Sequence, residues 1–274
     1  MRRASRTSSL VTLLRALAHG GVTEVDGFAD PTALRLLPPG WRALARVALA
    51  GNKRLFLAVS QGQGDLVALR TRVLDEAWGE AHRLGARQLV LLGAGLDGRA
   101  YRLETLSDCA VFEVDHPGTQ ALKRARAEGL VERARRHVFV PVDFEKDGLQ
   151  DALGAAGFLA SQRAFFIWEG VTPYLTEAAQ QATLAAVAEL SAPGSRLAMT
   201  YIEPGLKNAG VQGLVSALGE PFLGLMPRAL AAERLAQAGL RVIEDSGIDE
   251  WRRRFARRQR AALGLTERIA LAER

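Results

Sequence analysis

Three glycines interrupt an apolar run in the segment LVLLGAGLDGRAYRL, residues 89–103. Gly93, Gly95 and Gly98 satisfy the pattern G-x-G-x-x-G, which lets a backbone pass close to a bound ligand at the start of a helix. Asp115 stands 22 positions after Gly93, close to the offset of the acid that binds ribose hydroxyls in Rossmann-like folds. We interpret the glycines and Asp115 as a nucleoside site, with a turn or N-cap role as the alternative for Asp115.

An acid follows each of four successive apolar runs that read as strands. In chain order these acids are Asp97, Asp115, Asp143 and Glu169. Because parallel strands end at one edge of a sheet, we expect the four to surround one crevice. Such a crevice repels a pyrophosphate and attracts a cation. This description fits S-adenosylmethionine (SAM), which combines a ribose and an adenine with an ammonium and a sulfonium.

The segments that carry these residues resemble the four motifs of the leucine carboxyl methyltransferase-like family, a branch of the class I SAM-dependent methyltransferases. They read LVLLGAGLDGRAYRL, VFEVDHPGTQALKR, VPVDFEKDGL and FFIWEGVTPYL. The resemblance covers roughly residues 30–274 and is strongest over 66–180. Gly98 is a departure, because family members often have threonine at that position.

The resemblance implies a cofactor-binding role for each matched position. The SAM carboxylate is expected on Arg72, with Arg70 as the alternative, and the amino group beside Glu169. The ribose is expected on Asp115, and the adenine edge on Asp143. The complete set of expected cofactor residues is Arg72, Gly93, Ala94, Gly95, Asp115, Asp143, Phe144 and Glu169.

The residues that assist methyl transfer are less defined by the sequence. Transfer requires the nucleophile, the methyl group and the sulfur to be aligned. A carboxylate nucleophile needs no base, whereas a phenol gains from one. Tyr174, Tyr201 and His116 are candidates, with ordinary packing or a surface role as the alternatives. We expect O-methylation of a small molecule, a carboxylate ahead of a hydroxyl, on family resemblance and the scarcity of a base.

Three other functions share part of this pattern. An NAD(P)-dependent oxidoreductase would use the glycines and the later acid, but no Tyr-x-x-x-Lys is present and the acids suit a cation. A non-catalytic binding protein of the same fold is disfavoured by the complete set of acids. A nucleic-acid methyltransferase is suggested by the pI of about 10.1, but the expected Pro-Pro-Tyr type of motif is absent after the fourth strand.

Composition restricts the partners and the location. Cys109 is the only cysteine, which excludes a disulfide within the chain and thiolate zinc sites and suits a reducing cytoplasm. The four histidines form no metal-ligand pair, so we expect no metal. No apolar run reaches the roughly 18–20 residues of a membrane span. The basic clusters at 132–137 and 252–260 are interpreted as solvated helix faces, so no nucleic acid is expected; a homodimer is left open.

These residues require a scaffold that brings strand ends together. Residues 8–87 read as mainly helical, and we expect the segment 1–87 to form a lid on the substrate side of a SAM-binding core over 88–274. The core alternates strands and helices, which predicts an α/β, Rossmann-like, seven-stranded, mostly parallel sheet with helices on both faces. The expected strands are 88–92, 110–114, 137–142, 164–168, 195–202, 240–245 and 268–273.

Overall fold

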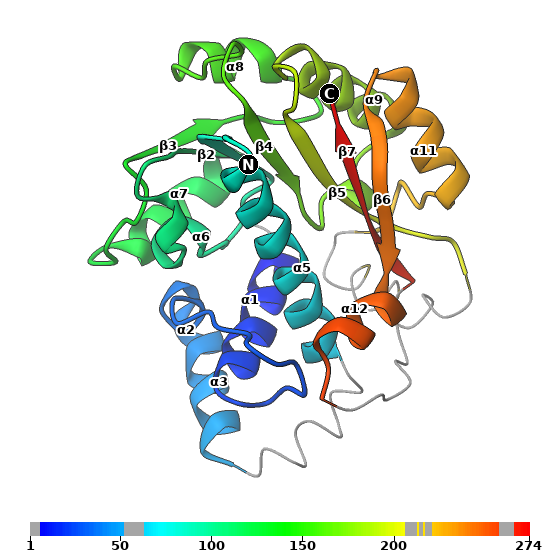
Figure 1. Ribbon diagram of the computed structural model, residues 1–274. Helices are drawn as coiled ribbons and strands as arrows, with labels where there is room; N and C mark the ends of the chain where they lie inside the picture. Colours follow the sequence, from blue (N-terminus) through cyan, green and yellow to red (C-terminus); the bar gives the residue numbers. More distant parts are fainter. Residues whose placement is uncertain (1–5, 52–62, 206–212, 214–215, 217–220, 258–265) are drawn as a thin grey trace.

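A seven-stranded sheet forms the centre of the protein, in a computed structural model that describes residues 6–51, 63–205, 213, 216, 221–257 and 266–274 (Figure 1). The strand order is β3-β2-β1-β4-β5-β7-β6. The strands are β1 (Gln88–Leu92), β2 (Ala110–Asp115), β3 (Arg136–Pro141), β4 (Ala164–Trp168), β5 (Arg196–Ile202), β6 (Arg241–Gly247) and β7 (Glu267–Glu273). β7 runs antiparallel to both of its neighbours, and the other pairs are parallel. The predicted sheet is confirmed.

Both faces of the sheet are buried, so its central strands are mostly apolar, with a few buried polar residues such as Gln88 and Glu113. In β1, Val90 and Leu92 belong to one hydrophobic core, and Leu89 and Leu91 belong to the other. The first core contains residues of α8 (Leu149–Ala155), α9 (Glu177–Glu189) and α11 (Arg228–Gln237). The second contains residues of α5 (Gln63–Arg83), α6 (Arg99–Arg102), α7 (Pro117–Ala127) and α12 (Ile248–Phe255). Continuous burial on both faces explains why these strands show no polar alternation.

The amino-terminal helices form a third, smaller core beside the sheet. They are α1 (Arg6–His19), α2 (Ala33–Leu36) and α3 (Pro39–Ala50). α1 packs along α5, which itself packs on the sheet (Figure 1). The division into a lid over 1–87 and a core over 88–274 stays a prediction. Within the described part of the chain, no helix combines the length and the apolarity needed to cross a bilayer.

Candidate functional site

A cavity of about 760 Å³ opens at the carboxyl ends of the parallel strands, beneath α1. This volume falls within the roughly 300–1,000 Å³ of ligand pockets. Most of the residues expected from the sequence line it. They are Gly93, Ala94, Gly95, Asp115, His116, Asp143, Phe144, Glu169 and Tyr174, together with the alternative residue Arg70.

The turn after β1 requires glycine at two positions. Gly93 and Gly95 have φ of +70° and +50°, a region that glycine enters without steric cost. A Cβ atom added at Gly93 would also overlap Cγ2 of Val171, which follows β4. The backbone amide of Gly95 donates to Oδ2 of Asp115 at 2.6 Å. The glycine turn and the acid at the end of β2 are therefore held together by this hydrogen bond.

Asp115 has a raised pKa in spite of two backbone donors. Its Oδ1 accepts the amide N–H of His116 at 2.6 Å, and its Oδ2 accepts that of Gly95. Burial raises the pKa of the Asp115 carboxyl by more than these hydrogen bonds lower it. Hydroxyl groups of a ligand could donate hydrogen bonds to this carboxylate and so replace the hydration that it loses on burial.

Asp143 lies at the far side of the cavity, after β3, in a loop that it helps to hold. Its Oδ1 accepts the Glu145 N–H at 3.2 Å, and its Oδ2 lies 3.3 Å from Nζ of Lys146. Burial opposes ionisation, but these two neighbours outweigh it and lower the pKa of Asp143. Phe144 lines the same end, so an acid and an aromatic ring lie together there.

Glu169, after β4, is bound by three arginines from three different helices. Its Oε1 accepts from Arg15 of α1 at 2.6 Å and from Arg70 of α5 at 2.9 Å, and its Oε2 accepts from Arg99 of α6 at 2.8 Å. Burial alone would raise the pKa of Glu169, but the three guanidinium groups hold the pKa well below its usual range. The side chain is 8% exposed.

These arginines bind further carboxylates behind the cavity. Arg99 also pairs with Asp97 and Asp75, and Arg70 pairs with Glu267 at 2.8 Å. Two of the four acids expected to attract a cation, Asp97 and Glu169, are thus already neutralised. All four acids line the one cavity as expected, but its Glu169 end carries both signs of charge and suits a zwitterion such as an amino-acid group.

Sequence reasoning missed Arg15, which the structure brings to Glu169 from 154 residues away. The available signal was helical spacing, because Val11 and Arg15 are four residues apart and fall on one face of α1. Arg99 was visible in the sequence directly after the glycine turn, but its shared contact with Glu169 depends on the fold.

Two expected site residues lie away from the cavity. The guanidinium of Arg72 lies 5.1 Å from the centre of the Phe255 ring, on the other side of α5 from Arg70. Tyr201 is fully buried in the core, and its hydroxyl donates to Asp245 at 2.7 Å. Burial raises the pKa of the Tyr201 hydroxyl, and the hydrogen bond and negative charge of Asp245 raise it further. The expected placements of Arg72 at the cofactor and of Tyr201 on the crevice rim are corrected.

Of the other two candidates, Tyr174 and His116 line the cavity. Tyr174 lies in the short helix η2 (Thr172–Tyr174), with its ring 5.4 Å from that of Phe222. His116 caps α7, because its Nδ1 accepts the Gly118 N–H at 3.1 Å. This bond places the proton of the neutral ring on Nε2, so neither nitrogen is poised to accept another.

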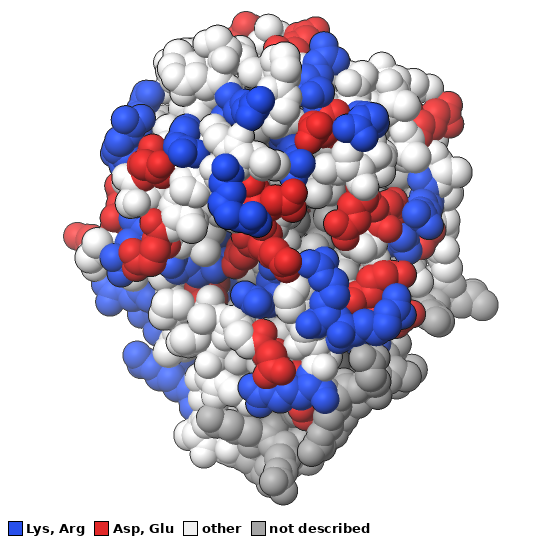
Figure 2. Space-filling model, viewed as in Figure 1, with Lys and Arg blue, Asp and Glu red and all other residues white. Residues whose placement is uncertain are grey.

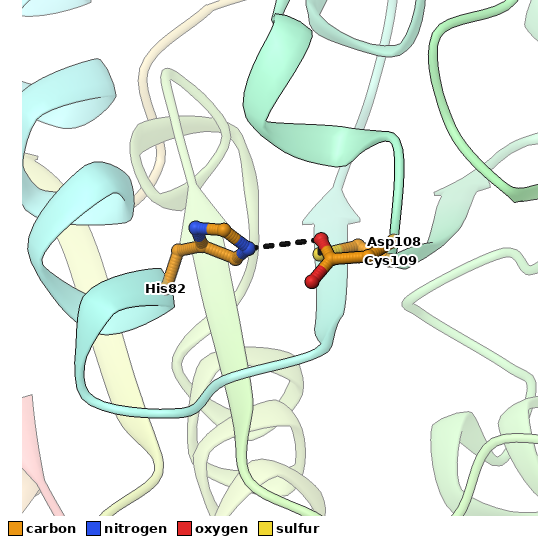
Figure 3. Close-up of side chains that lie close together, drawn as sticks. All are labelled: His82, Asp108 and Cys109. Atoms are coloured by element: carbon orange, nitrogen blue, oxygen red, sulfur yellow. Dashed lines mark hydrogen bonds and ion pairs between the residues drawn. The ribbon is translucent and has the colours of Figure 1, made fainter.

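Away from the cavity, a cluster of potential metal ligands lies near the amino-terminal ends of the parallel strands. His82 at the end of α5 contacts Asp108 at 2.9 Å, with Cys109 adjacent, as Figure 3 shows. The other Asp108 oxygen pairs with Arg87 at 2.9 Å, and burial raises the pKa of the Cys109 thiol to about 12. A metal would have to break the contacts of His82 and Cys109 with Oδ1 of Asp108 and ionise this thiol, so we interpret the cluster as structural.

The family model described as leucine carboxyl methyltransferase matches residues 8–188 of the chain. The chain belongs to this family. A relative from Mycobacteroides abscessus, named "Putative S-adenosyl-L-methionine-dependent methyltransferase", is 38% identical over 219 residues, which cover 75% of this chain and 70% of the relative. A second relative, from Streptomyces coelicolor, is also named as a putative S-adenosyl-L-methionine-dependent methyltransferase. It is 46% identical over 132 residues, which cover 47% of this chain and 43% of the relative.

Solved structures share the fold of this methyltransferase at low identity. A DUF574 family protein from Streptomyces avermitilis has a TM-score of 0.62 and 13% identity, with 99% of this chain and 98% of that chain covered. The magnesium protoporphyrin IX methyltransferase of Synechocystis, with bound S-adenosylhomocysteine (SAH), has a TM-score of 0.51 and 16% identity, with 89% of this chain and 100% of that chain covered. The chain is a SAM-dependent methyltransferase with SAM as its cofactor.

Proposed function

We propose that this methyltransferase transfers the methyl group of SAM to an oxygen of a small molecule, with a carboxylate favoured over a hydroxyl. The supporting observation is that, among the described lining residues of the cavity, no histidine is free to act as a base. His116, the one histidine among them, uses its Nδ1 to cap α7. A carboxylate acceptor is already ionised at neutral pH, whereas a phenol with a pKa of about 10 gains from a base.

The lining carboxylates are engaged in other contacts. Glu169 is ion-paired with three arginines, and Glu145 accepts from the amide and the hydroxyl of Thr176 at 3.0 and 2.9 Å. Asp115 accepts two backbone amides, Asp143 accepts the Glu145 amide and pairs with Lys146, and both acids would face the cofactor. A proton acceptor must have a lone pair directed at the reacting group, so these contacts favour an acceptor that has no proton to lose.

The residues of the cavity fit SAM. The turn at Gly93 and Gly95 leaves room where a side chain would fill the space, and Asp115 beside it would accept the ribose hydroxyls. Asp143 and Phe144 would hold the adenine. The amino-acid end would lie at Glu169, with Arg70 in place of Arg72 for the carboxylate.

SAM supplies a methyl group on a positively charged sulfur. The chain would then contribute alignment, which can account for roughly 7–11 kcal/mol of a barrier, and exclusion of water by α1. Val11 of α1 and Val171 after β4 both line the cavity, so apolar side chains border the space beyond the glycine turn. An in-line approach of the acceptor through this space needs no residue that moves a proton.

Two measurements test the proposal. Isothermal titration should show SAH binding to the wild type and none to Asp115→Ala. Transfer of a tritiated methyl group to an acid should give an ester, which mild alkali hydrolyses to volatile methanol; an alkali-stable ether would identify a hydroxyl acceptor instead. Unchanged SAH binding by Asp115→Ala would show that the ribose position is wrong.

A small-molecule substrate is supported by the distribution of charge. On the face shown in Figure 2, basic and acidic side chains are interspersed. Arg254 and Arg253, within a basic cluster predicted from the sequence, pair with Glu76 and Glu250 at 2.9 and 3.6 Å; residues 258–260 of that cluster lie outside the described residues. We also propose a cytoplasmic location, which fits the single buried Cys109. The homodimer stays a prediction that light scattering checks.

A further inference from the structure

Helix α1 presents to the cavity one face that contains both polar and apolar side chains, here called the α1 stripe. Thr7, Ser8, Val11, Thr12 and Arg15 line it, at the spacing of a single helical face. The stripe begins next to the glycine turn, because a Cβ added at Gly95 would lie 3.3 Å from Cβ of Ser8. It ends at Glu169, where Arg15 donates at 2.6 Å. The helix therefore runs along the cavity from the glycine turn to Glu169, where the amino-acid end of SAM would lie.

Arg15 differs from the other two arginines at Glu169 in its partners. Arg70 has a second carboxylate in Glu267, and Arg99 has two more, in Asp97 and Asp75. Among the described residues, Arg15 forms an ion pair with Glu169 alone. If Arg15 turned toward another anion, Glu169 would still keep two guanidinium groups. Of the three, Arg15 is the one that can accept an incoming carboxylate without leaving a buried charge uncompensated.

Apolar side chains lie on the cavity wall near this stripe. Val11 comes from α1, Val171 and Leu175 flank η2, and Leu223 follows in the segment that begins at Pro221. A cation with apolar side chains around it matches an organic acid with a hydrocarbon body. Arg15 itself is only 5% exposed, so an ion pair formed there is shielded from water.

We propose that Arg15 binds the carboxylate of the acceptor, a small acid with an apolar body. This inference rests on the proposed function and adds the substrate class and its recognition residue. In the reaction, a carboxylate oxygen forms a bond to the methyl carbon, the carbon–sulfur bond breaks, and its electron pair stays on sulfur. The anion and the sulfonium become a neutral ester and a neutral thioether, and no proton moves. The ester has lost the charge that Arg15 binds, which favours its release, and Arg15 can return to Glu169.

The test uses SAH-saturated protein and paired probes. Octanoate and 3-phenylpropionate are titrated against their primary amides, which keep the body but lack the charge. The variants are Arg15→Gln, Arg15→Lys and Arg70→Gln, with Arg46→Gln on the exposed face of α3 as the matched control. The acids should bind the wild type and Arg46→Gln, and the amides should not. Arg15→Gln should lose acid affinity by at least about tenfold and keep SAH affinity within about threefold, with Arg15→Lys intermediate.

Other results overturn the inference. If Arg15→Gln weakens SAH as much as Arg70→Gln does, Arg15 binds the cofactor carboxylate instead. If acids and amides bind alike, or neither acid binds, the cavity does not select a carboxylate at Arg15, while SAH binding by the wild type would leave the methyl-donor site intact. Failure of the wild type to bind SAH would overturn the proposed function and this inference together.

Discussion

Arg70 and Arg72 lie two residues apart on α5 and point to opposite sides of the helix. Arg70 lines the cavity and donates to Glu169 at 2.9 Å, whereas the Arg72 guanidinium lies over the ring of Phe255. At 3.6 residues per turn, two positions are separated by about 200° around the helix axis. A motif that matches both arginines in sequence can therefore place only one of them at the cofactor.

Removing Arg70 should weaken SAH binding, and removing Arg72 should not. A hydrogen bond to a charged group contributes roughly 1.5–3 kcal/mol, so Arg70→Gln should raise the dissociation constant by at least about tenfold. Arg72→Gln should leave it within about threefold of the wild type. Titration calorimetry checks both, with circular dichroism to confirm folding. A larger loss for Arg72→Gln would restore the original sequence-based assignment.

Removing the Glu169 charge should destabilise the fold. Glu169→Gln leaves three guanidinium groups around one neutral amide, and loss of one partner of a buried ion pair costs about 3–5 kcal/mol. Asp143→Asn is the matched control, because Asp143 also lines the cavity but its side chain is 19% exposed and pairs with a surface lysine. It should cost less than about 1 kcal/mol. Urea unfolding measures both, and equal costs would contradict the view of Glu169 as the shared partner of three helices.

Stability should fall as the pH rises past the unfolded pKa of His137. The His137 ring lies 3.1 Å from Glu113 of β2 and 3.0 Å from Glu132. Buried Lys123 of α7 forms an ion pair with the same Glu113, and the Tyr101 ring of α6 packs edge-on against His137. Burial lowers the pKa of His137, but the two carboxylates outweigh burial and the nearby Lys123, and raise it. The protonated ring then stabilises the fold fully below about pH 6.5, and this contribution is lost as pH passes the higher folded pKa. Urea unfolding of the wild type and of His137→Gln at pH 6 and above should show the decline only in the wild type.

A side chain at Gly98 should displace the segment before α2. A Cβ added there would overlap Oγ1 of Thr32 and lie 3.1 Å from Oδ1 of Asp30. The Thr32 hydroxyl fills the space that a side chain at position 98 would occupy. Gly98→Ala should cost about 1–3 kcal/mol as an overpacking change. Combined with Thr32→Ala, it should cost less than the sum of the two single variants; strict additivity in unfolding experiments would count against this explanation.

The strands could be predicted closely because their signal is local. β1 and β4 coincide with the predicted ranges, since these short runs are buried throughout, are almost entirely apolar and end at a glycine or an acid. The antiparallel direction of β7 depends on pairing with β5 and β6, which apolar periodicity does not encode.

The proposed cofactor side of the site was also accessible from sequence, because the glycine turn, Asp115, Asp143 and Glu169 each lie at or within two residues of the end of a strand. The proposed acceptor side was not. Arg15 and Glu169 are separated by 154 residues, and only the packing of α1 on α5 brings them together. The environment of Tyr201 likewise depends on Asp245, which lies on a different strand.

The meeting of α1, α5 and α6 at one carboxylate after β4 has a consequence for how the molecule melts. Any partial opening that lifts α1 away from the sheet must separate Arg15 from Glu169 and expose the apolar face beside it. The amino-terminal helices are thereby linked to the same cooperative unit as the strands. Calorimetry should record a single heat-absorption peak for both.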